Sequence, residues 1–577
     1  MNSSPEIRQR DITTEDRLPE TLNPVLRRVL LARGVSRAEQ LDLGLQGLAH
    51  PASLSGLDKA AALLATAIQE GRRICIVGDF DADGATGTAV AMRGLHALGA
   101  RRVDFRVPNR FEFGYGLTRG LVGTLAESPP DLVVTVDSGI SCLDGTAAAR
   151  DLGCDVLITD HHLPGERLPE ATAIVNPNLP GDAFPSKALA GVGVMFYLLS
   201  AVRQVLSDSD WFSVRRPMPR LDSLLDLVAL GTVADLVPLD FNNRVLVRQG
   251  MDRIRAGRAC EGVMALLRVA GRDYRHLVAS DLGFAVAPRL NAAGRLEDMS
   301  VGIRCLLSDD VDQALELAGR LDRLNRERQA VQAQMQREAL EAIEALPDVE
   351  HSDGQRWSLC LHDPGWHQGV VGLVASRIKE RVHRPVVAFA PEEPGSERLK
   401  GSARSIRGLH IRDVLAHVHA THPGLIDAFG GHAMAAGLTL KAQALEPFAE
   451  AFEDAVRTIL GDELPSADVK TDGSLSPAEF TLDFARELRE LGPWGQRFPE
   501  PLFDGLFEVL DQRVVGGAHL KMRVRPEGAR DSLDAIAFGR LPEDLPGTQS
   551  VRLLYRLDVN HFRGESRCQL IVERIVA

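Results

Sequence analysis

Three short apolar runs, each followed directly by acidic or histidine residues, constrain the fold of this chain of 577 residues more than any other feature. The runs and the residues that follow them are 74–78 with Asp79, 132–136 with Asp137, and 155–159 with Asp160-His161-His162. Stretches with helical spacing separate the runs, and such alternation predicts a parallel sheet with helices on both faces. Ligands of these sheets bind at the carboxyl ends of the strands. We therefore expect the acidic and histidine side chains to meet at one edge of the sheet.

The rest of the chain requires further domains, because 577 residues exceed one hydrophobic core and suggest about four domains. Residues 311–346 contain few helix breakers and predict one long helix. Five short β candidates between 506 and 575 suit a small barrel of the OB type. The domains that we expect are an N-terminal helical segment at 1–65, a catalytic α/β domain at 66–305, a long connecting helix at 306–350, a second α/β domain at 351–462 and an OB-like β-barrel at 463–577.

Charge and cysteine content narrow the class of protein. The first 20 residues are polar and mixed in charge, so we expect no signal peptide, and no apolar run is long enough to span a bilayer. The seven cysteines are scattered without a CxxC pair, which is typical of reduced thiols in the cytoplasm. The net charge of −13 argues against general affinity for nucleic acid. It does not exclude a nucleic-acid enzyme, because carboxylates that hold divalent metals count as negative.

The acidic cluster indicates a metal site. Asp79, Asp81 and Asp83 alternate in what reads as an extended loop, so they need not face the same way, and Asp235 lies in an otherwise apolar segment. Oxygen ligands with imidazole and no thiolate suit Mn²⁺ or Mg²⁺ better than zinc. Two such ions about 4 Å apart would polarise a phosphoryl oxygen and generate hydroxide at neutral pH. One Asp after a strand is usually a turn residue or a helix cap, but four such segments in one region favour a site.

The motifs in this order resemble the DHH phosphoesterase superfamily, and most closely its RecJ family of single-strand-specific exonucleases, from about residue 70 to the end. The segments that carry the resemblance are Asp79-Phe80-Asp81-Ala82-Asp83-Gly84 (the second position is more often Tyr), Pro108-Asn109-Arg110 with Gly114-Tyr115-Gly116, Val136-Asp137-Ser138-Gly139, Thr159-Asp160-His161-His162, Ala234-Asp235-Leu236-Val237-Pro238-Leu239, Pro288-Arg289-Leu290-Asn291-Ala292-Ala293-Gly294-Arg295, Gly401-Ser402-Ala403-Arg404-Ser405 and Gly430-Gly431-His432-Ala433-Met434-Ala435-Ala436-Gly437. The resemblance implies a parallel-sheet DHH lobe, a long connecting helix, a DHH-associated α/β lobe and an OB-like barrel.

The resemblance also implies roles for single residues. The expected metal ligands are Asp79, Asp81, Asp83, Asp137, His161 and Asp235, and the expected catalytic residues are Asp79, Asp83, His161 and His162. For His162 the resemblance implies either a metal ligand or a contact to the scissile phosphate. The expected pocket for a terminal 5′ phosphate contains Asn109, Arg110, Ser402 and Arg404, with Arg289 or Arg295. For His432 two interpretations remain open, an anion-binding glycine turn or a tight strand-to-helix turn in which His432 is structural.

The C-terminal region contains a second candidate surface. Lys521, Arg523 and Arg525 alternate along one predicted strand, which places them on one face. Several aromatic residues lie nearby in the sequence, namely Phe503, Phe507, Phe538, Tyr555 and Phe562. A basic groove with aromatic platforms is how OB folds hold single strands. Most of these aromatic side chains are instead expected to fill the barrel core.

The acidic cluster predicts two-metal phosphodiester hydrolysis with Mn²⁺ or Mg²⁺. The resemblance to the family further implies a processive 5′→3′ exonuclease on single-stranded DNA that releases 5′ mononucleotides and acts in DNA repair and recombination. Two alternatives are a phosphodiesterase for short oligonucleotides or cyclic dinucleotides, and a non-catalytic replication scaffold. We expect a cytoplasmic monomer with no membrane partner. A helicase and a single-strand-binding protein are hypothetical protein partners.

Overall fold

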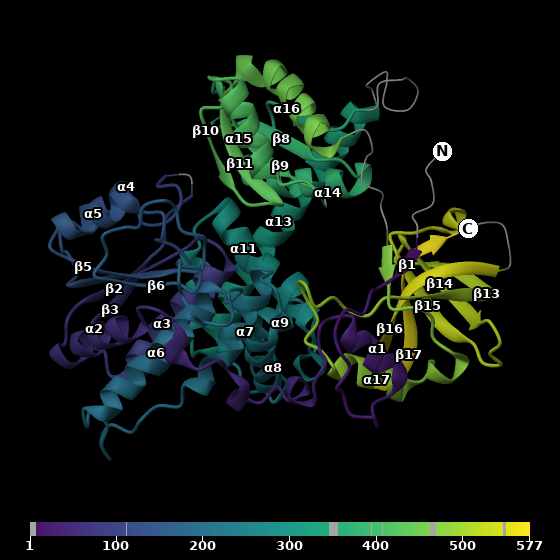
Figure 1. Ribbon diagram of the computed structural model, residues 1–577, viewed down its shortest axis with the longest axis horizontal. Coiled ribbons are helices and arrows are strands. Elements are labelled where there is room, and N and C mark those ends of the chain that lie inside the picture. Colours follow the sequence, from purple (N-terminus) through teal and green to yellow (C-terminus); the bar gives the residue numbers. More distant parts are fainter. Residues whose placement is uncertain are drawn as a thin grey trace. The chain divides into compact units, whose positions relative to one another are not determined.

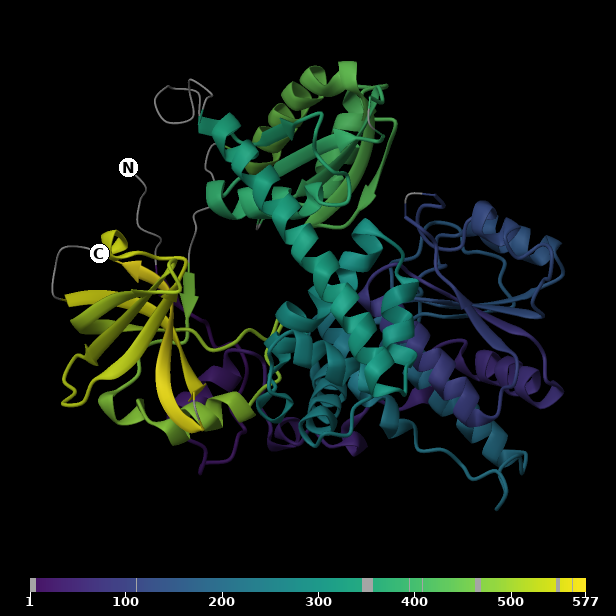
Figure 2. The same cartoon turned by 180° about the vertical axis from the view of Figure 1, so that it is seen from behind.

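The computed structural model describes residues 7–110, 112–344, 356–393, 395–406, 408–461, 469–545, 550–562 and 564–576. The chain forms two compact units (Figures 1 and 2). The first consists of Met1–Asp322 with Val469–Ala577, and the second of Arg323–Asp468. All seven cysteines are free thiols, as their scattered spacing predicts.

A parallel sheet of five strands forms the N-terminal part of the first unit, in the order β3-β2-β4-β5-β6. Its strands are β2 (Ile74–Gly78), β3 (Val103–Arg106), β4 (Leu132–Val136), β5 (Asp155–Thr159) and β6 (Ala173–Val175). Every residue of β2 and β4 is buried, because helices cover both faces of the sheet. The strands β2, β4 and β5 are direct neighbours, so the prediction that the three apolar runs share one sheet edge is confirmed.

Helices lie on the two faces of this sheet, as Figure 1 shows. On one face are α4 (Arg119–Gly123) and α5 (Leu143–Asp151), and on the other are α2 (Leu57–Glu70), α3 (Ala82–Leu98) and α6 (Gly191–Asp208). A helical region follows, consisting of α7 (Leu225–Ala234), α8 (Phe241–Arg255), α9 (Glu261–Val269), α10 (Ala279–Asp281), a π-helical segment (Leu282–Val286), α11 (Ala287–Leu296) and α12 (Ser300–Leu307). The predicted long helix is α13 (Val311–Glu344), which begins in the first unit and ends in the second.

The second unit contains a mixed sheet in the order β10-β11-β9-β8-β7. Its strands are β7 (Leu359–His362), β8 (Val386–Pro391), β9 (Arg398–Arg404), β10 (Ala428–Gly431) and β11 (Ala435–Lys441), and its helices are α14 (Val371–Val382), α15 (Ile411–Thr421) and α16 (Leu445–Leu460). Only the β7–β8 pair is parallel among the described strands of this sheet. This arrangement confirms the predicted α/β character of the lobe.

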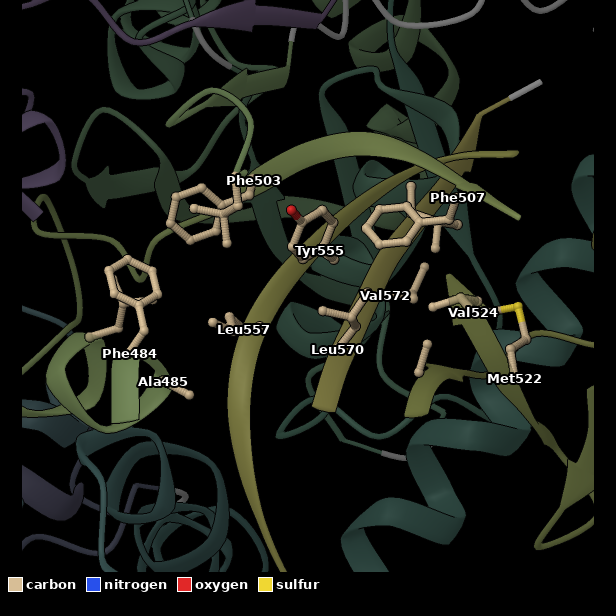
Figure 3. Close-up of a cluster of buried hydrophobic side chains, with 14 of the residues drawn as sticks. Phe484, Ala485, Phe503, Phe507, Met522, Val524, Tyr555, Leu557, Leu570 and Val572 are labelled. Atoms are coloured by element: carbon tan, nitrogen blue, oxygen red, sulfur yellow. The ribbon is translucent and has the colours of Figure 1, made fainter. Parts of the chain in front are cut away.

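The C-terminal part of the first unit is a closed barrel of five strands, in the order β13-β14-β15-β17-β16. The strands are β13 (Phe503–Val515), β14 (His519–Pro526), β15 (Leu533–Phe538), β16 (Ser550–Phe562) and β17 (Glu565–Val576). Figure 3 shows Phe503, Phe507 and Tyr555 within its buried core. Phe538 and Phe562 are exposed. The barrel is therefore confirmed, as is the expectation that most of the aromatic side chains fill it.

The N-terminal segment packs with this distant barrel, a relation that the sequence did not indicate. Helix α1 (Pro24–Leu31) places Val25, Leu26 and Val29 in the hydrophobic cluster of the barrel. Strand β1 (Ile7–Gln9) pairs in parallel with β12 (Val469–Thr471). Helix α17 (Leu482–Glu490) contributes Phe484 and Leu488 to the same cluster. The two ends of the chain thus share one core.

A buried ion pair fixes this association. The two guanidinium nitrogens Nη1 and Nη2 of Arg33 lie 2.7 and 2.9 Å from the two carboxylate oxygens of Asp472. The Nε of Arg33 also donates to the carbonyl oxygen of Pro499, at 2.7 Å. Neither charged side chain is open to solvent. Loss of Arg33 would leave the buried Asp472 carboxylate with only the more distant Arg10, at 3.8 Å, as a cationic partner.

Replacing Arg33 tests this ion pair. We expect Arg33→Met to lower the free energy of unfolding by about 3–5 kcal/mol, because the Asp472 carboxylate stays buried. Urea denaturation followed by circular dichroism measures the loss, and Arg37→Met, at an exposed position, is the control. The double variant Arg33→Met/Asp472→Leu should recover part of the stability. If Arg33→Met and Arg37→Met lowered the free energy of unfolding equally, the ion pair would not stabilise this association.

Among the described residues, no helix is both long enough and apolar enough to cross a membrane.

Candidate metal centre

Three aspartates of the first motif lie where β2 passes into α3. Asp79 follows β2, and Asp81 is the N-cap of α3, whose carboxylate Oδ1 accepts a hydrogen bond from the amide of Gly84 at 2.9 Å. This cap starts the helix at Ala82, so Asp83 lies in the first helical turn and not in the extended loop that the sequence suggested. A side chain at Gly84 would lie 2.6 Å from the backbone of Asp79. The turn therefore requires glycine at that position.

Backbone amides at the start of α6 hold the carboxylate of Asp83. The amides of Gly191 and Val192 donate to its two oxygens at 2.7 and 3.0 Å. Asp137 follows β4 with a φ of 60°, a left-handed conformation that Asp and Asn tolerate better than most residues. A Cβ at Gly191 would lie 2.6 Å from the Cβ of Asp137. Because Gly191 has no side chain, the carboxylates of Asp83 and Asp137 can both lie close to the start of α6.

The histidine pair is oriented by the first residue of its own triplet. The carboxylate of Asp160 accepts from the amides of Ile140 and His162 at 2.9 and 3.1 Å, and lies 2.7 Å from Nδ1 of His162. Burial lowers the pKa of His162, but the hydrogen bond and the charge of Asp160 outweigh it and raise the pKa to about 9. Asp160 is thus a positioning residue, to which the sequence had assigned no separate role.

His161 and Asp235 complete the cluster. Asp235 follows the last residue of α7, and the Nε2 of His161 lies 3.5 Å from its Oδ2. The same nitrogen lies 3.0 Å from Oδ1 of Asp137 and 4.0 Å from Oδ2 of Asp83. Side chains from β2, β4, β5, α3 and α7 therefore meet at one point.

The geometry of the cluster fits divalent cations. Three sets of side chains each place their ligand atoms within 4.8 Å of one another, namely Asp79, Asp81 and Asp137; Asp83, His161 and Asp235; and Asp137, His161 and His162. Burial, and then the neighbouring carboxylates, raise the pKa of Asp79, Asp137 and Asp235. The buried Oδ1 of Asp79 accepts no hydrogen bond from the described part of the chain. Crowded buried oxygens of this kind are stabilised by bound cations. The individual ligand roles remain predictions.

Arg110 lies beside the carboxylates, as a phosphate-binding residue would require. Its guanidinium lies 4.2 Å from the ring centre of Phe80. In the sequence of the first motif, Phe80 stands between Asp79 and Asp81. Burial lowers the pKa of Arg110, and the charges of Asp79 and Asp81 oppose this shift. The backbone carbonyl of Asn109 accepts from Phe113 at 2.8 Å and so shapes the turn that presents Arg110.

Helix α11 docks against the loop of the first motif. The side-chain oxygen of Asn291 accepts from the amide of Ala82 at 2.8 Å, and a Cβ at Gly294 would lie 1.8 Å from the carbonyl oxygen of Phe80. Of the two predicted phosphate ligands on this helix, Arg289 forms an ion pair of 2.8 Å with Asp322. Arg295 lies in the last turn of α11. Asn291 was part of a recognised motif, but its positioning role had not been assigned.

Other polar residues missed by the sequence analysis hold the same elements. The hydroxyl of Tyr115 donates to the carbonyl oxygen of Asp137 at 3.3 Å. The side-chain amide of Asn176 donates to the carbonyl oxygen of His162 at 2.9 Å. The side-chain amide of Asn178 donates to the carbonyl oxygen of His161 at 2.5 Å. Tyr115 lies in a recognised motif. The two asparagines have no motif that could have identified them.

Three other predicted substrate residues, Ser402, Arg404 and His432, belong to the second unit. In the second unit, Ser402 and Arg404 lie on β9, and Nη1 of Arg404 donates to Oγ of Ser402 at 3.1 Å. Nη2 of Arg404 would lie 2.7 Å from a Cβ at Gly372, so the start of α14 lies against this guanidinium. His432 occupies the turn between β10 and β11, where its amide donates to the carbonyl oxygen of Ala435 at 2.8 Å. That turn is a hairpin, not the strand-to-helix turn of the structural interpretation.

The basic residues of the barrel share the outer face of β14, as predicted. Their side chains alternate with the buried Leu520, Met522 and Val524. Lys521 lies 2.9 Å from Asp534, and Arg525 lies 3.6 Å from Glu508. Arg523 is the exposed member of the row. The surface is therefore a row of basic side chains that is partly neutralised by acidic neighbours.

Comparison with known proteins identifies this combination of fold and site. The sequence matches the DHH family N-terminal domain over residues 73–232, the DHHA1 domain over 356–458 and the RecJ OB domain over 471–574. These matches define a DHH protein with an added OB domain. The chain is 51% identical to the single-stranded-DNA-specific exonuclease RecJ of Escherichia coli (strain K12), over 100% of both chains. The protein belongs to the RecJ family.

A solved structure of a relative agrees with this assignment. The crystal structure of RecJ from Thermus thermophilus in complex with Mn²⁺ superimposes with a TM-score of 0.79 and 32% identity. It covers 99% of this chain and 80% of the relative. A second structure of that RecJ, in complex with Mg²⁺, has a TM-score of 0.73 and 30% identity, and it covers 99% of this chain and 78% of the relative. The recognition of this family from the ordered motifs is thereby confirmed.

Replacing Asp137 with asparagine tests the metal site without disturbing its backbone. Asparagine accepts the positive φ, and the change removes one of several buried charges that repel each other. Without metal, we expect Asp137→Asn to melt at the parental temperature or above it. Mn²⁺ at 100 times its dissociation constant should stabilise the parent by about 2.7 kcal/mol and the variant far less.

Differential scanning calorimetry with and without Mn²⁺ measures both effects. Asp151→Asn, at an exposed position, should behave as the parent. A parental response to Mn²⁺ in Asp137→Asn would show that this carboxylate does not hold the ion.

Proposed function

We propose that this protein is a metal-dependent exonuclease specific for single-stranded DNA that acts in DNA repair and recombination. The observation that carries the proposal is the largely buried cluster of five aspartates and two histidines at one sheet edge, in a chain related over its whole length to RecJ exonucleases. Phosphodiester hydrolysis is the chemistry that such clusters of oxygen ligands and imidazole serve.

The finer proposal is a reaction with two ions and 5′→3′ polarity that releases 5′ mononucleotides. Asp79, Asp81 and Asp137 would hold one ion, and Asp83, His161 and Asp235 the other. Two bound Mn²⁺ or Mg²⁺ ions would supply Lewis acidity at the scissile phosphate and lower the pKa of an attacking water. His162, whose Nδ1 lies 2.7 Å from Asp160, would either bind a metal ion or contact the scissile phosphate.

Polarity would follow from recognition of a terminal 5′ phosphate. Arginine offers a planar set of donors that matches phosphate oxygens. Arg110 beside the cluster and Arg404 with Ser402 in the second unit are the proposed ligands. Arg289 would have to exchange its ion pair with Asp322 for the phosphate, whereas Arg295 is the alternative on the same helix. His432 and Asn109 are proposed substrate contacts, each within its own unit.

The other parts of the chain would serve this reaction. We assign catalysis to residues 66–305, closure over the strand to 351–462 and strand delivery to the barrel at 463–577, with 306–350 as connector and 1–65 as a support. The proposed partners besides single-stranded DNA are a helicase and a single-strand-binding protein, and the proposed state is a cytoplasmic monomer. These assignments follow from the resemblance to the family and from the separate cores of the parts.

Removal of Asp83 tests the catalytic proposal. We expect Asp83→Ala to reduce the hydrolysis of 5′-phosphorylated single-stranded DNA in Mn²⁺ by about 1000-fold or more, because the carboxylate lies within a predicted ligand set. Release of labelled nucleotides from 5′-labelled and 3′-labelled strands measures rate and polarity. Asp151→Ala is the control, and duplex DNA should resist both proteins. Parental rates in Asp83→Ala would show that the metal-site assignment is wrong.

Charge reversal on the barrel separates this function from the hydrolysis of short oligonucleotides. We expect Arg523→Glu to weaken binding of a strand of about 20 nucleotides and to reduce the slope of log K against log salt by about 1, because a phosphate contact is lost. Fluorescence anisotropy at several salt concentrations measures both quantities. Rapid cleavage of dinucleotides with no preference for the long strand would favour the oligonucleotide phosphodiesterase instead.

A further inference from the structure

Phe284 exposes an aromatic ring at an irregular point of the helical region. It lies in the π-helical segment Leu282–Val286, and its side chain is 81% exposed. π-helical turns inside helical regions are frequently found at functional sites. Exposure of one ring alone is common on protein surfaces, so the position gains meaning only from the groove that the ring lines.

The ring faces a groove inside the first unit. The groove has a volume of about 1450 Å³ and lies between the helical region and the barrel. Phe284 and Leu236 line it from the helical region, and Phe538 and Gln569 line it from the barrel. Phe538 is also largely exposed, at 57%. Each wall of the groove therefore presents one phenylalanine ring.

The barrel wall continues the basic row of β14. In the register of β14 and β15, Phe538 lies opposite His519, and Arg523 lies opposite Asp534. Residues opposite each other in antiparallel strands point to the same face, so Phe538 shares its face with the row Lys521, Arg523 and Arg525. A chain of phosphates that follows this row would reach the groove at Phe538.

The helical wall leads toward the metal centre. A Cβ at Gly283, beside Phe284, would lie 3.2 Å from the side chain of Val233, which also lines the groove. Val233 precedes Asp235 by two residues at the end of α7. The contact between Gly283 and Val233 therefore places the segment that carries Phe284 against the end of α7, next to the predicted ligand Asp235.

Between these ends, three arginines of the groove are already paired with carboxylates, whereas Arg489 donates to the backbone carbonyl of His276. Arg272 lies 3.3 Å from Asp281, Arg275 lies 2.9 Å from Asp273, and Arg556 lies 2.5 Å from Glu500. Paired guanidinium groups attract phosphate weakly, because the acidic partner cancels the field. The exposed rings can hold a strand here in a way that these paired groups cannot, through contact with its bases.

We propose that Phe284 is a stacking platform for one base of the single-stranded substrate, with Phe538 as a second platform on the barrel wall. This inference rests on the proposed function. Stacking on aromatic rings tolerates every base, since each has a π face, and it rejects paired bases whose faces are covered. Phe284 would thus contribute to strand specificity without any hydrogen bond to a base edge.

An abasic scan crossed with a Phe284 substitution tests the proposal. Strands of about 20 nucleotides carry one abasic residue at successive positions, and their binding to the Asp83→Ala protein is measured by fluorescence anisotropy, so that the DNA stays intact. With Phe284 present, one position should weaken binding by about fivefold to a hundredfold. With Phe284→Ala, the loss at that position should disappear, because the stacking partner is already absent. The salt dependence of binding should not change.

Two further variants complete the test. Phe284→Trp should preserve the position-specific loss, and Val214→Ala, which removes a fully exposed apolar side chain outside the groove, should behave as the parent. The same sensitivity at every abasic position with and without Phe284 would overturn the proposal. If the parental protein degrades the intact strand while the scan is flat, only the role of Phe284 is wrong. If the parental protein neither binds nor degrades it, the proposed function itself has failed.

Discussion

Mutual repulsion among buried carboxylates is the constraint around which the first unit is built. Asp79, Asp83, Asp137 and Asp235 approach one another at one sheet edge, where burial raises the pKa of each. The folded state tolerates this repulsion because contacts from the surrounding elements fix the carboxylates in position. Backbone amides at the start of α6 bind Asp83, and glycine at 191 leaves room for Asp137. Divalent cations would convert this repulsion into binding energy.

The parts of this arrangement that the sequence predicted are those with a local signature. An apolar run that ends in an acid identifies both a buried strand and its functional end, and the neighbours β2, β4 and β5 bear this out. The alternation of basic residues in β14 likewise predicted that their side chains share one face of the strand, and the burial pattern agrees. The helical position of Asp83 was missed, because capping by Asp81 extends α3 by one turn beyond its apolar pattern.

The supporting contacts left no such signature. The amide of Gly191 that holds Asp83 belongs to a residue 108 positions further along the chain, and a backbone amide is present at every residue except proline, so it leaves no motif. Asn291 acts through a hydrogen bond to the backbone of Ala82, which residue identity alone does not reveal. The ion pair of Arg33 with Asp472 spans 439 positions, so the N-terminal segment could not be assigned to the barrel from its sequence.

The central claim is that the cluster at this sheet edge is a two-ion site. Counting the Mn²⁺ bound per chain by electron paramagnetic resonance tests it most directly, since ions that share a bridging carboxylate couple magnetically. The account predicts two coupled Mn²⁺ ions in the parental protein, and loss of the coupling when Asp137 is replaced by asparagine. A protein that binds no Mn²⁺, or whose bound Mn²⁺ is unaffected by that replacement, would contradict it.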